Sequence, residues 1–122
     1  MLKFSFVVAA EPYKYEAIDT VINLGEAVIK KGHKLLGIFF FGSGVYNIKK
    51  DRKLFTSVRD LPKRLQEFAE KNDSRIAACS TWVSITGLKE SDFITQACSD
   101  GLGGLSELIG NSDRVVFFGP GR

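Results

Sequence analysis

Short apolar segments alternate with segments of helical periodicity along nearly the whole chain, and this alternation limits the fold more than any other feature. Residues 2–10 and 35–41 are apolar almost throughout, as strands covered on both faces of a sheet are. Residues 75–78 and 114–118 are shorter segments of the same kind. Residues 15–31 place apolar side chains three and four apart, which is typical of an amphipathic helix. Strands separated by helices predict an α/β fold with a parallel sheet covered by helices on both faces.

Further helices are predicted from their end signals. Asp60 and Pro62 suit the start of a helix over residues 61–71, and shorter helices are expected over residues 80–85, 90–96 and 105–109. Residues 45–60 mix charged and apolar side chains and predict a long excursion. No internal repeat or linker interrupts the pattern, and 122 residues suffice for one compact domain. We therefore expect a single domain over residues 1–122.

The composition indicates an ordinary globular protein, with 44% hydrophobic and 25% charged residues. Cys79 and Cys98 are the only cysteines, too few for a disulfide framework, which favours a reducing compartment. The longest apolar run, residues 35–41, is far below the ~20 residues of a membrane helix. Residues 1–10 are too short and too interrupted by polar side chains for a secretory signal. We expect a cytoplasmic protein without a membrane partner.

The formal net charge is +3, and much of the positive charge gathers in Lys49, Lys50, Arg52 and Lys53. Such a run is ordinarily a solvated surface. The sharper alternative is a docking patch for an acidic protein or for nucleic acid. No aromatic side chains are interleaved with these bases, as stacking on single strands would require. We expect no direct nucleic-acid binding and keep the four residues as a candidate patch for docking a protein.

Cys79 is the residue best placed to carry chemistry. It lies where the apolar segment 76–78 meets the polar residues Ser80 and Thr81. If a helix begins there, its unpaired backbone N–H groups favour the thiolate, which is the reactive form of the side chain. The alternative is a small packing residue, because free cysteine is among the most buried residue types. Position alone leaves both interpretations open.

Other catalytic arrangements find less support. Cys98 precedes the glycine-rich residues 101–104 and is expected on a neighbouring loop, either as a packing residue or as a resolving thiol. The only histidine, His33, is expected in a surface turn at the far end of the sheet from Cys79. One histidine and two separated cysteines fall short of a tetrahedral zinc set, so no metal is expected. The serines lack a histidine base, which argues against a serine hydrolase.

A nucleotide or flavin site is also weakly supported. Residues 101–104 lack both the G-x-G-x-x-G spacing and the lysine of a phosphate loop, and they do not follow the first strand. Close packing of a helix start against the sheet explains these glycines better. Residues 42–44 follow a strand without a helix promptly after them. A flavodoxin-like binder is therefore a distant alternative, and no cofactor is expected.

Five blocks of sequence occur in a fixed order along the chain. They are Gly32-His33-Lys34 leading into Ile38-Phe39-Phe40, Gly44-Val45-Tyr46-Asn47, Cys79 at the end of the third strand, Gly101-Leu102-Gly103 with Leu105 and Glu107, and Asp113-Arg114-Val115-Val116-Phe117. In order and approximate spacing, this set resembles the DsrE/TusD family of small sulfur-relay proteins, which includes DsrE/DsrF/DsrH-like members. The resemblance covers nearly the whole chain.

The resemblance implies a three-layer α/β/α sandwich with a mostly parallel five-stranded sheet. It also implies that Cys79 accepts sulfane sulfur as a persulfide from a TusA-like donor and passes it to a TusE/DsrC-like acceptor, for tRNA thiolation or dissimilatory sulfur metabolism. Family members assemble with DsrF/DsrH-like or TusB/TusC-like subunits, or with themselves, in trimer-based and commonly hexameric complexes. The alternative within the family is a non-catalytic subunit in which Cys79 is structural.

The same resemblance suggests which residues surround a reachable Cys79. Relatives close to TusD carry arginines in the helix after the cysteine, where this chain has residues 80–86, Ser-Thr-Trp-Val-Ser-Ile-Thr. Ser80 or Thr81 is therefore expected to donate a hydrogen bond to the sulfur. The residues expected to line a pocket at the sulfur, because they follow or lie near strand carboxyl ends, are Gly44, Tyr46, Asn47, Gly101 and Gly103. Cys98 is the candidate auxiliary thiol.

Overall fold

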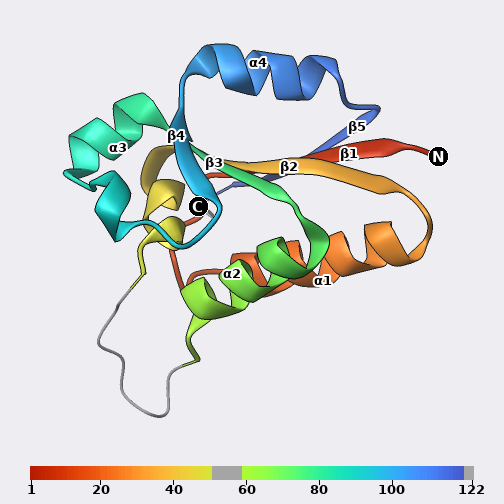
Figure 1. Cartoon of the computed structure of the whole chain (residues 1–122), viewed down its shortest axis with the longest axis horizontal. Helices are drawn as coiled ribbons and strands as arrows, with labels where there is room; N and C mark the ends of the chain where they lie inside the picture. The colour runs from red at the N-terminus through yellow and green to blue at the C-terminus, as the bar shows by residue number, and fades with distance from the viewer. Residues whose placement is uncertain (51–58, 120–122) are drawn as a thin grey trace.

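Five parallel strands form a single sheet through the centre of the molecule (Figure 1). The computed structural model describes residues 1–50 and 59–119. The strands are β1 (Lys3–Val8), β2 (Lys34–Phe40), β3 (Arg75–Cys79), β4 (Ala97–Asp100) and β5 (Arg114–Phe118). Their order across the sheet is β4-β3-β2-β1-β5, and each neighbouring pair is parallel. All five carboxyl ends therefore lie at one edge.

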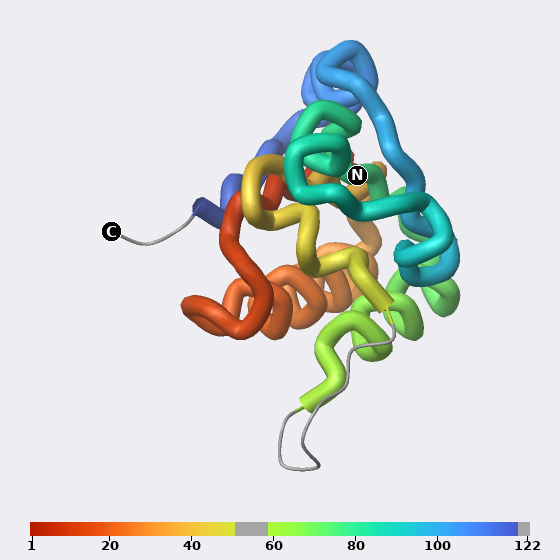
Figure 2. The backbone as a smooth tube through the Cα atoms, turned by 90° about the vertical axis from the view of Figure 1, so that its left-hand side faces the viewer, coloured from red at the N-terminus to blue at the C-terminus, as the bar shows by residue number. Residues whose placement is uncertain are grey.

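Helices cover both faces of this sheet, which confirms the expected three-layer α/β/α sandwich. Helices α1 (Ala17–Lys30) and α2 (Leu61–Asn72) lie on one face, and α4 (Leu102–Gly110) lies on the other (Figures 1 and 2). Helix α3 (Ser80–Thr86) and the 3₁₀ helices η1 (Gly42–Ile48) and η2 (Glu90–Asp92) complete the described elements. The chain steps from β1 to β4 in one direction and returns through α4 to β5, and right-handed crossovers put such a return on the opposite face.

The alternation of side chains along the strands divides the apolar residues into two cores. The larger core lies between the sheet and helices α1 and α2, and includes Phe6, Ile38 and Ile76. The smaller core lies on the α4 face and contains Phe39, Ala77 and Cys79. Successive residues of a strand point to opposite faces, so Ala78 belongs to the large core and its neighbour Cys79 to the small one.

Two helices differ from the sequence-based expectation, and one strand was not expected from the residue pattern. Helix α4 begins at Leu102, before the predicted start at residue 105, and the helix predicted over 90–96 is limited to the 3₁₀ turn Glu90–Asp92. Residues 97–100 form β4, so Cys98 lies on an edge strand and the expectation of a loop is wrong. Of the described helices, none combines the length and the apolar character needed to cross a bilayer.

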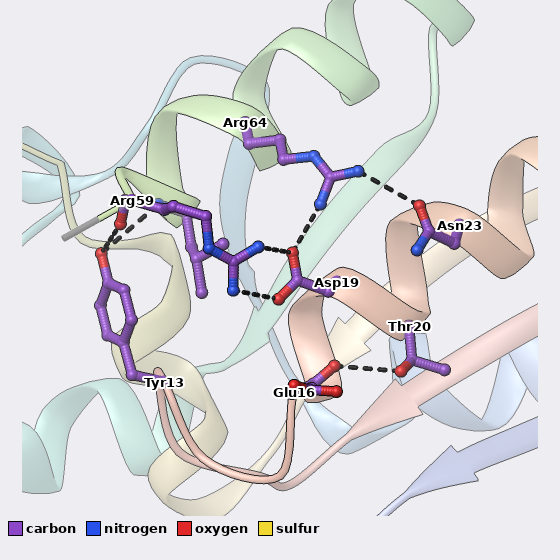
Figure 3. A network of polar contacts seen from close by, with 8 residues as sticks. Tyr13, Glu16, Asp19, Thr20, Asn23, Arg59 and Arg64 are labelled. Atoms are coloured by element: carbon purple, nitrogen blue, oxygen red, sulfur yellow. Dashed lines mark hydrogen bonds and ion pairs between the residues drawn. The ribbon is translucent and has the colours of Figure 1, made fainter. Parts of the chain in front are cut away.

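A network of charged side chains joins the starts of α1 and α2 (Figure 3). The guanidinium of Arg59 donates to both carboxylate oxygens of Asp19, at 2.6 and 2.7 Å, and Arg64 donates to Oδ1 of Asp19 at 2.6 Å. Arg64 also reaches the Oδ1 of Asn23, and the Tyr13 hydroxyl donates to the Arg59 carbonyl at 2.7 Å. The hydrogen bond from Arg59 is the main cause that holds the pKa of Asp19 below its ordinary value. The network fastens α2 to α1.

Candidate functional site

Cys79 is the last residue of β3 and directly precedes α3, at the edge of the sheet where the strands end. Its side chain points into the small core beside Phe39 and Ala77, and only 1% of the residue is exposed. Partly buried side chains of Phe41, Trp82, Leu105 and Leu108 pack around this core. The position agrees with the sequence-based expectation. The expected accessibility of the sulfur is not observed, because residues from other segments of the chain cover it in this conformation.

The cover over Cys79 has two parts that belong to different elements. One part is an aromatic pair, Phe41 directly after β2 and Trp82 in the first turn of α3, whose rings meet edge to face with centroids 6.0 Å apart and an interplanar angle of 69°. Trp82 also packs against the large core, which anchors it on that side. The other part is Leu105 and Leu108 of α4. A reagent can therefore reach the sulfur only after one of the two parts moves.

The first residues of α3 do not contact the sulfur as expected. Ser80 and Thr81 are exposed, and within the described part of the chain neither donates a hydrogen bond to Cys79. Helix α3 is seven residues long and ends at Gly87, whose φ of +78° is in the left-handed region that favours glycine. The side chains that pack with the thiol in the small core are therefore those of apolar residues.

Gly44 and Asn47 hold the 3₁₀ helix η1 against the carboxyl end of β1. A Cβ atom on Gly44 would overlap the carbonyl oxygen of Val8, so only glycine permits this approach. The Asn47 amide donates to the carbonyls of Ala10 and Gly44, each at 2.9 Å, and the residue is 3% exposed. Both residues thus fix the backbone that follows Phe41. Tyr46, on the same 3₁₀ helix, is partly exposed.

The glycine-rich stretch packs a helix start against the sheet, as predicted. Gly101 is the N-cap of α4, and its N–H donates to Oδ1 of Asp100 at 2.8 Å. A Cβ atom on Gly104 would overlap the Asp100 carboxylate, whereas the same position on Gly103 is open space. The Asp100 carboxylate also pairs with the guanidinium of Arg75.

The sequence analysis missed the pair of Arg75 and Asp100. In the sheet, Asp100 is the direct neighbour of Cys79 across the β3–β4 pairing, so the two side chains lie on the same face. The available signal was an aspartate between an apolar segment and a glycine-rich helix start. Without knowledge of β4 as a strand, nothing in the sequence places that aspartate beside the cysteine.

Cys98 lies on the same face of the sheet but one strand further out. It pairs with Ala77, is exposed, and its thiol donates a weak hydrogen bond to the Ile76 carbonyl at 3.6 Å. This register puts its Cα about 8 Å from that of Cys79 on the diagonal, since strands are about 4.8 Å apart and two residues span about 6.6 Å. A disulfide needs Cα atoms closer than about 7 Å. A resolving role for Cys98 therefore requires backbone movement.

None of the remaining sequence-predicted residues that the structure describes packs in the small core around Cys79. The N–H of Lys50 donates to the Asp92 carbonyl at 2.8 Å, and Lys49 forms a bridge with Phe93, so both lie beside η2. Arg52 and Lys53 lie outside the described residues. His33 is at the amino end of β2, where its Nδ1 accepts the N–H of Leu2 at 3.0 Å. Of the candidate residues that the structure describes, Cys98 and Gly101 thus lie near Cys79, through the pairing of β3 with β4.

Comparison with known families decides the affiliation of the chain. The model of the DsrE/DsrF-like family matches residues 2–118. The chain belongs to the DsrE/DsrF-like family. Among curated relatives, the candidate sulfurtransferase DsrE of Allochromatium vinosum is 26% identical to this DsrE/DsrF-like chain, over 97% of the chain and 99% of the relative. The sulfurtransferase TusD homolog of Vibrio parahaemolyticus is 29% identical, over 96% and 98% respectively.

Solved structures show that the DsrE/DsrF-like chain shares its fold with distant proteins. The YchN protein of E. coli superposes with a TM-score of 0.83 at 18% identity, over 97% of this chain and all of YchN (100%). The protein MTH1491 of Methanobacterium thermoautotrophicum, whose function is described as unknown, superposes with a TM-score of 0.71 at 13% identity, over 96% and 99%. The resemblance noted in the sequence is confirmed, and the curated relatives are named as sulfurtransferases.

Proposed function

We propose that this DsrE/DsrF-like protein carries sulfane sulfur as a persulfide on Cys79. The observation that supports the proposal most is the place of Cys79 at the junction of β3 and α3, at the edge of the sheet where the strands end. It is supported further by curated relatives that match the chain from end to end and are named sulfurtransferases. The chain offers one other thiol, Cys98 on the edge strand β4, as an auxiliary.

The proposed reaction consists of two thiol exchanges without net oxidation. The Cys79 thiolate attacks the outer sulfur of a donor persulfide, the donor S–S bond breaks, and the donor thiolate leaves with the electron pair. Cys79 then carries the S–SH group. An acceptor thiolate attacks the outer sulfur of that group in the same way and restores the Cys79 thiolate. No cofactor takes part in either step.

The burial of Cys79 suits storage of the persulfide and limits its transfer. An S–SH group surrounded by Phe39, Trp82 and Leu105 is shielded from water and from oxidants that would remove it. Both exchanges require an incoming sulfur to approach Cys79 in line, so the cover must open when a partner docks. The proposal therefore includes a closed storage state, with the sulfur buried as Cys79 is in this structure, and an open transfer state.

The partners that we propose are proteins. A TusA-like protein would supply the sulfur and a TusE/DsrC-like protein would accept it in the cytoplasm, for tRNA thiolation or dissimilatory sulfur metabolism. Lys49 and Lys50 would contribute to the attraction of an acidic partner surface. Related DsrF/DsrH-like or TusB/TusC-like subunits, or further copies of this chain, would complete an assembly.

Exposed apolar side chains on β5 and α4 support such an assembly. Val116 and Phe118 pack against the large core, so the alternate residues Val115 and Phe117 project from the α4 side of the edge strand β5. Phe117 is 62% exposed, and two side chains of α4 add to the exposed apolar surface, Leu102 and Ile109. Apolar side chains gathered at the surface mark protein interfaces more often than isolated ones do.

The decisive experiment measures sulfur loading by mass spectrometry. The protein is incubated with a persulfide donor, and we expect the intact mass to increase by one sulfur atom. The gain should be lost in Cys79→Ser and kept in Cys98→Ser. Loading that persists in Cys79→Ser would exclude Cys79 from the mechanism. A Cys79 that takes up no sulfur from any donor would favour the alternative, a non-catalytic subunit in which this cysteine only packs.

A further inference from the structure

Helix α4 is the more weakly held part of the cover over Cys79. None of its residues is buried, and Leu105 and Leu108 are only partly so. Glycine occupies three of its nine positions, Gly103, Gly104 and Gly110, and each glycine weakens a helix relative to alanine. The aromatic part of the cover is better anchored, because Trp82 packs against both cores. Of the two parts of the cover, α4 is therefore the one held by fewer buried contacts.

The C-terminal end of α4 is tied firmly to β1. The Ser112 hydroxyl donates to the Leu108 carbonyl at 2.7 Å and also contacts the hydroxyl of the fully buried Ser5. The N–H of Asp113 donates to the Lys3 carbonyl at 2.7 Å, and the Asp113 carboxylate accepts the N–H of Lys3 at 2.8 Å. Because these contacts hold the segment after α4 in place, residues 111–113 are the point about which the helix would turn.

The first turn of α4 packs on the carboxylate of Asp100. Asp100 accepts the N–H of Gly101, and Gly104 packs directly on its oxygens. A negative charge beneath the first turn also favours the helix dipole. The guanidinium of Arg75, on the neighbouring strand β3, pairs with this carboxylate and orients it under the helix. The pair is partly exposed, with 51% of the Arg75 side chain and 26% of the Asp100 side chain accessible.

We propose that α4 is a movable cover hinged at residues 111–113 and latched at its first turn by the Arg75–Asp100 pair, and that release of this latch exposes Cys79. The proposal rests on the proposed function in one respect only: opening of the cover would give sulfur donors and acceptors access to Cys79. Asp100 is the neighbour of Cys79 across the sheet, so the latch lies beside the sulfur and within reach of a partner that docks on this edge. Arg75 and Asp100 are thus positioning residues that act through α4.

The test follows the rate at which iodoacetamide, a small neutral reagent, alkylates Cys79. All variants are full-length chains that also carry Cys98→Ser, so the alkylation seen by mass spectrometry belongs to Cys79 alone. We expect Asp100→Asn and Arg75→Gln each to raise the rate about two- to fivefold, because each removes the charge pair that seats α4. The double variant should be no faster than the faster single one, since both residues belong to one latch. Asp73→Asn, an exposed site with the same change of charge, is the matched control and should leave the rate unchanged.

Two further readouts separate release of the latch from general weakening of the domain. Added salt should accelerate alkylation in the parent and leave Asp100→Asn unaffected, since salt screens an exposed ion pair. Amide hydrogen exchange in Asp100→Asn should be faster in α4 and unchanged in β3. Gly104→Ala should also raise the alkylation rate, because its Cβ displaces α4 from Asp100 even though alanine favours a helix.

Three results would overturn the proposal. The first is an equal alkylation rate in Asp100→Asn and the parent. The second is exchange that accelerates in β3 as much as in α4, which would mean that the whole domain is destabilised. The third is acceleration in Trp82→Ala without any in the latch variants, which would make the aromatic pair the movable part. Sulfur loading is measured separately. If the latch variants alkylate faster but Cys79 never takes up sulfur, the carrier function is disproved, and the proposal that α4 is a movable cover is still supported.

Discussion

Asp19 shows how much one residue can contribute to the contact between two helices. Its carboxylate is 14% exposed and receives two guanidinium groups, Arg59 and Arg64, which are 65% and 40% exposed. The carboxylate is largely enclosed, and its two partners lie on α2 or just before it. The charge of Asp19 therefore helps to orient α2 against α1. The lowered pKa of Asp19 means that folding favours the ionised form.

The stability of the protein should therefore depend on pH through Asp19. In the unfolded chain this carboxyl titrates near 3.8, and in the folded chain its pKa is lower. Its contribution is complete above the unfolded pKa and is lost as the pH falls through the folded value. We expect Asp19→Asn to lower the free energy of unfolding by about 1 kcal/mol at neutral pH. Urea titrations of both proteins should show this difference shrinking in acid, whereas a constant difference would contradict the assignment.

The position of Cys79 could be predicted from sequence because the change from apolar to polar residues marks a strand end locally. Its burial could not, since the covering residues Phe41 and Leu105 come from segments far along the chain and depend on sheet order. The role of Asn47 was missed for a similar reason. Its side chain binds the carbonyl of Ala10, in a segment that no local pattern brings near.

At the scale of elements, helix α2 was predicted well because its start carries its own signals. Asp60 accepts the N–H of Lys63 at 3.1 Å, and Pro62 lies in the first turn, as the sequence indicated. Strand β4 lacks such signals. It has four residues, lies at an edge and keeps Cys98 exposed, so no alternation of apolar side chains reveals it. Elements whose stability depends on tertiary pairing are the ones that local patterns miss.

The cap of α2 gives a test at this scale. Replacing Asp60 by alanine removes the acceptor for the Lys63 N–H, and we expect the free energy of unfolding to fall by about 1 kcal/mol. Asp60→Ser keeps an oxygen in the same place and should recover most of the loss. Urea unfolding followed by circular dichroism measures both. Equal losses in the two variants would mean that the carboxylate acts through its charge and not as a cap.

For the whole molecule, the alternation of strands and helices was enough to predict a parallel α/β sandwich, but not the strand order. Strand β5 lies beside β1 because α4 crosses the opposite face of the sheet. The periodicity of the sequence does not indicate on which face a helix crosses. That placement leaves β5 as an edge strand with Phe117 exposed. The exposed apolar side chains of β5 thus result from the topology and not from poor packing.

Assembly through β5 can be tested by native mass spectrometry and sedimentation. We expect the parent to form oligomers and Phe117→Asp to shift the population to monomers that keep the parent's far-UV circular dichroism spectrum, because Phe117 is already exposed in the single chain. Ile85→Asp is the matched control, since Ile85 is 64% exposed on α3. A parent that is monomeric, or a Phe117→Asp protein that assembles as before, would remove β5 from the interface.

The pairing of β1 with β5 has a consequence for the synthesis of the protein. Strand β1 acquires its second neighbour only from residues 114–118, the last of the described strands. Until those residues are made, an interior strand of the finished sheet is therefore an open apolar edge, available to other nascent chains. Completion of the sheet must therefore wait for the segment that follows α4, however early β1 and β2 have paired.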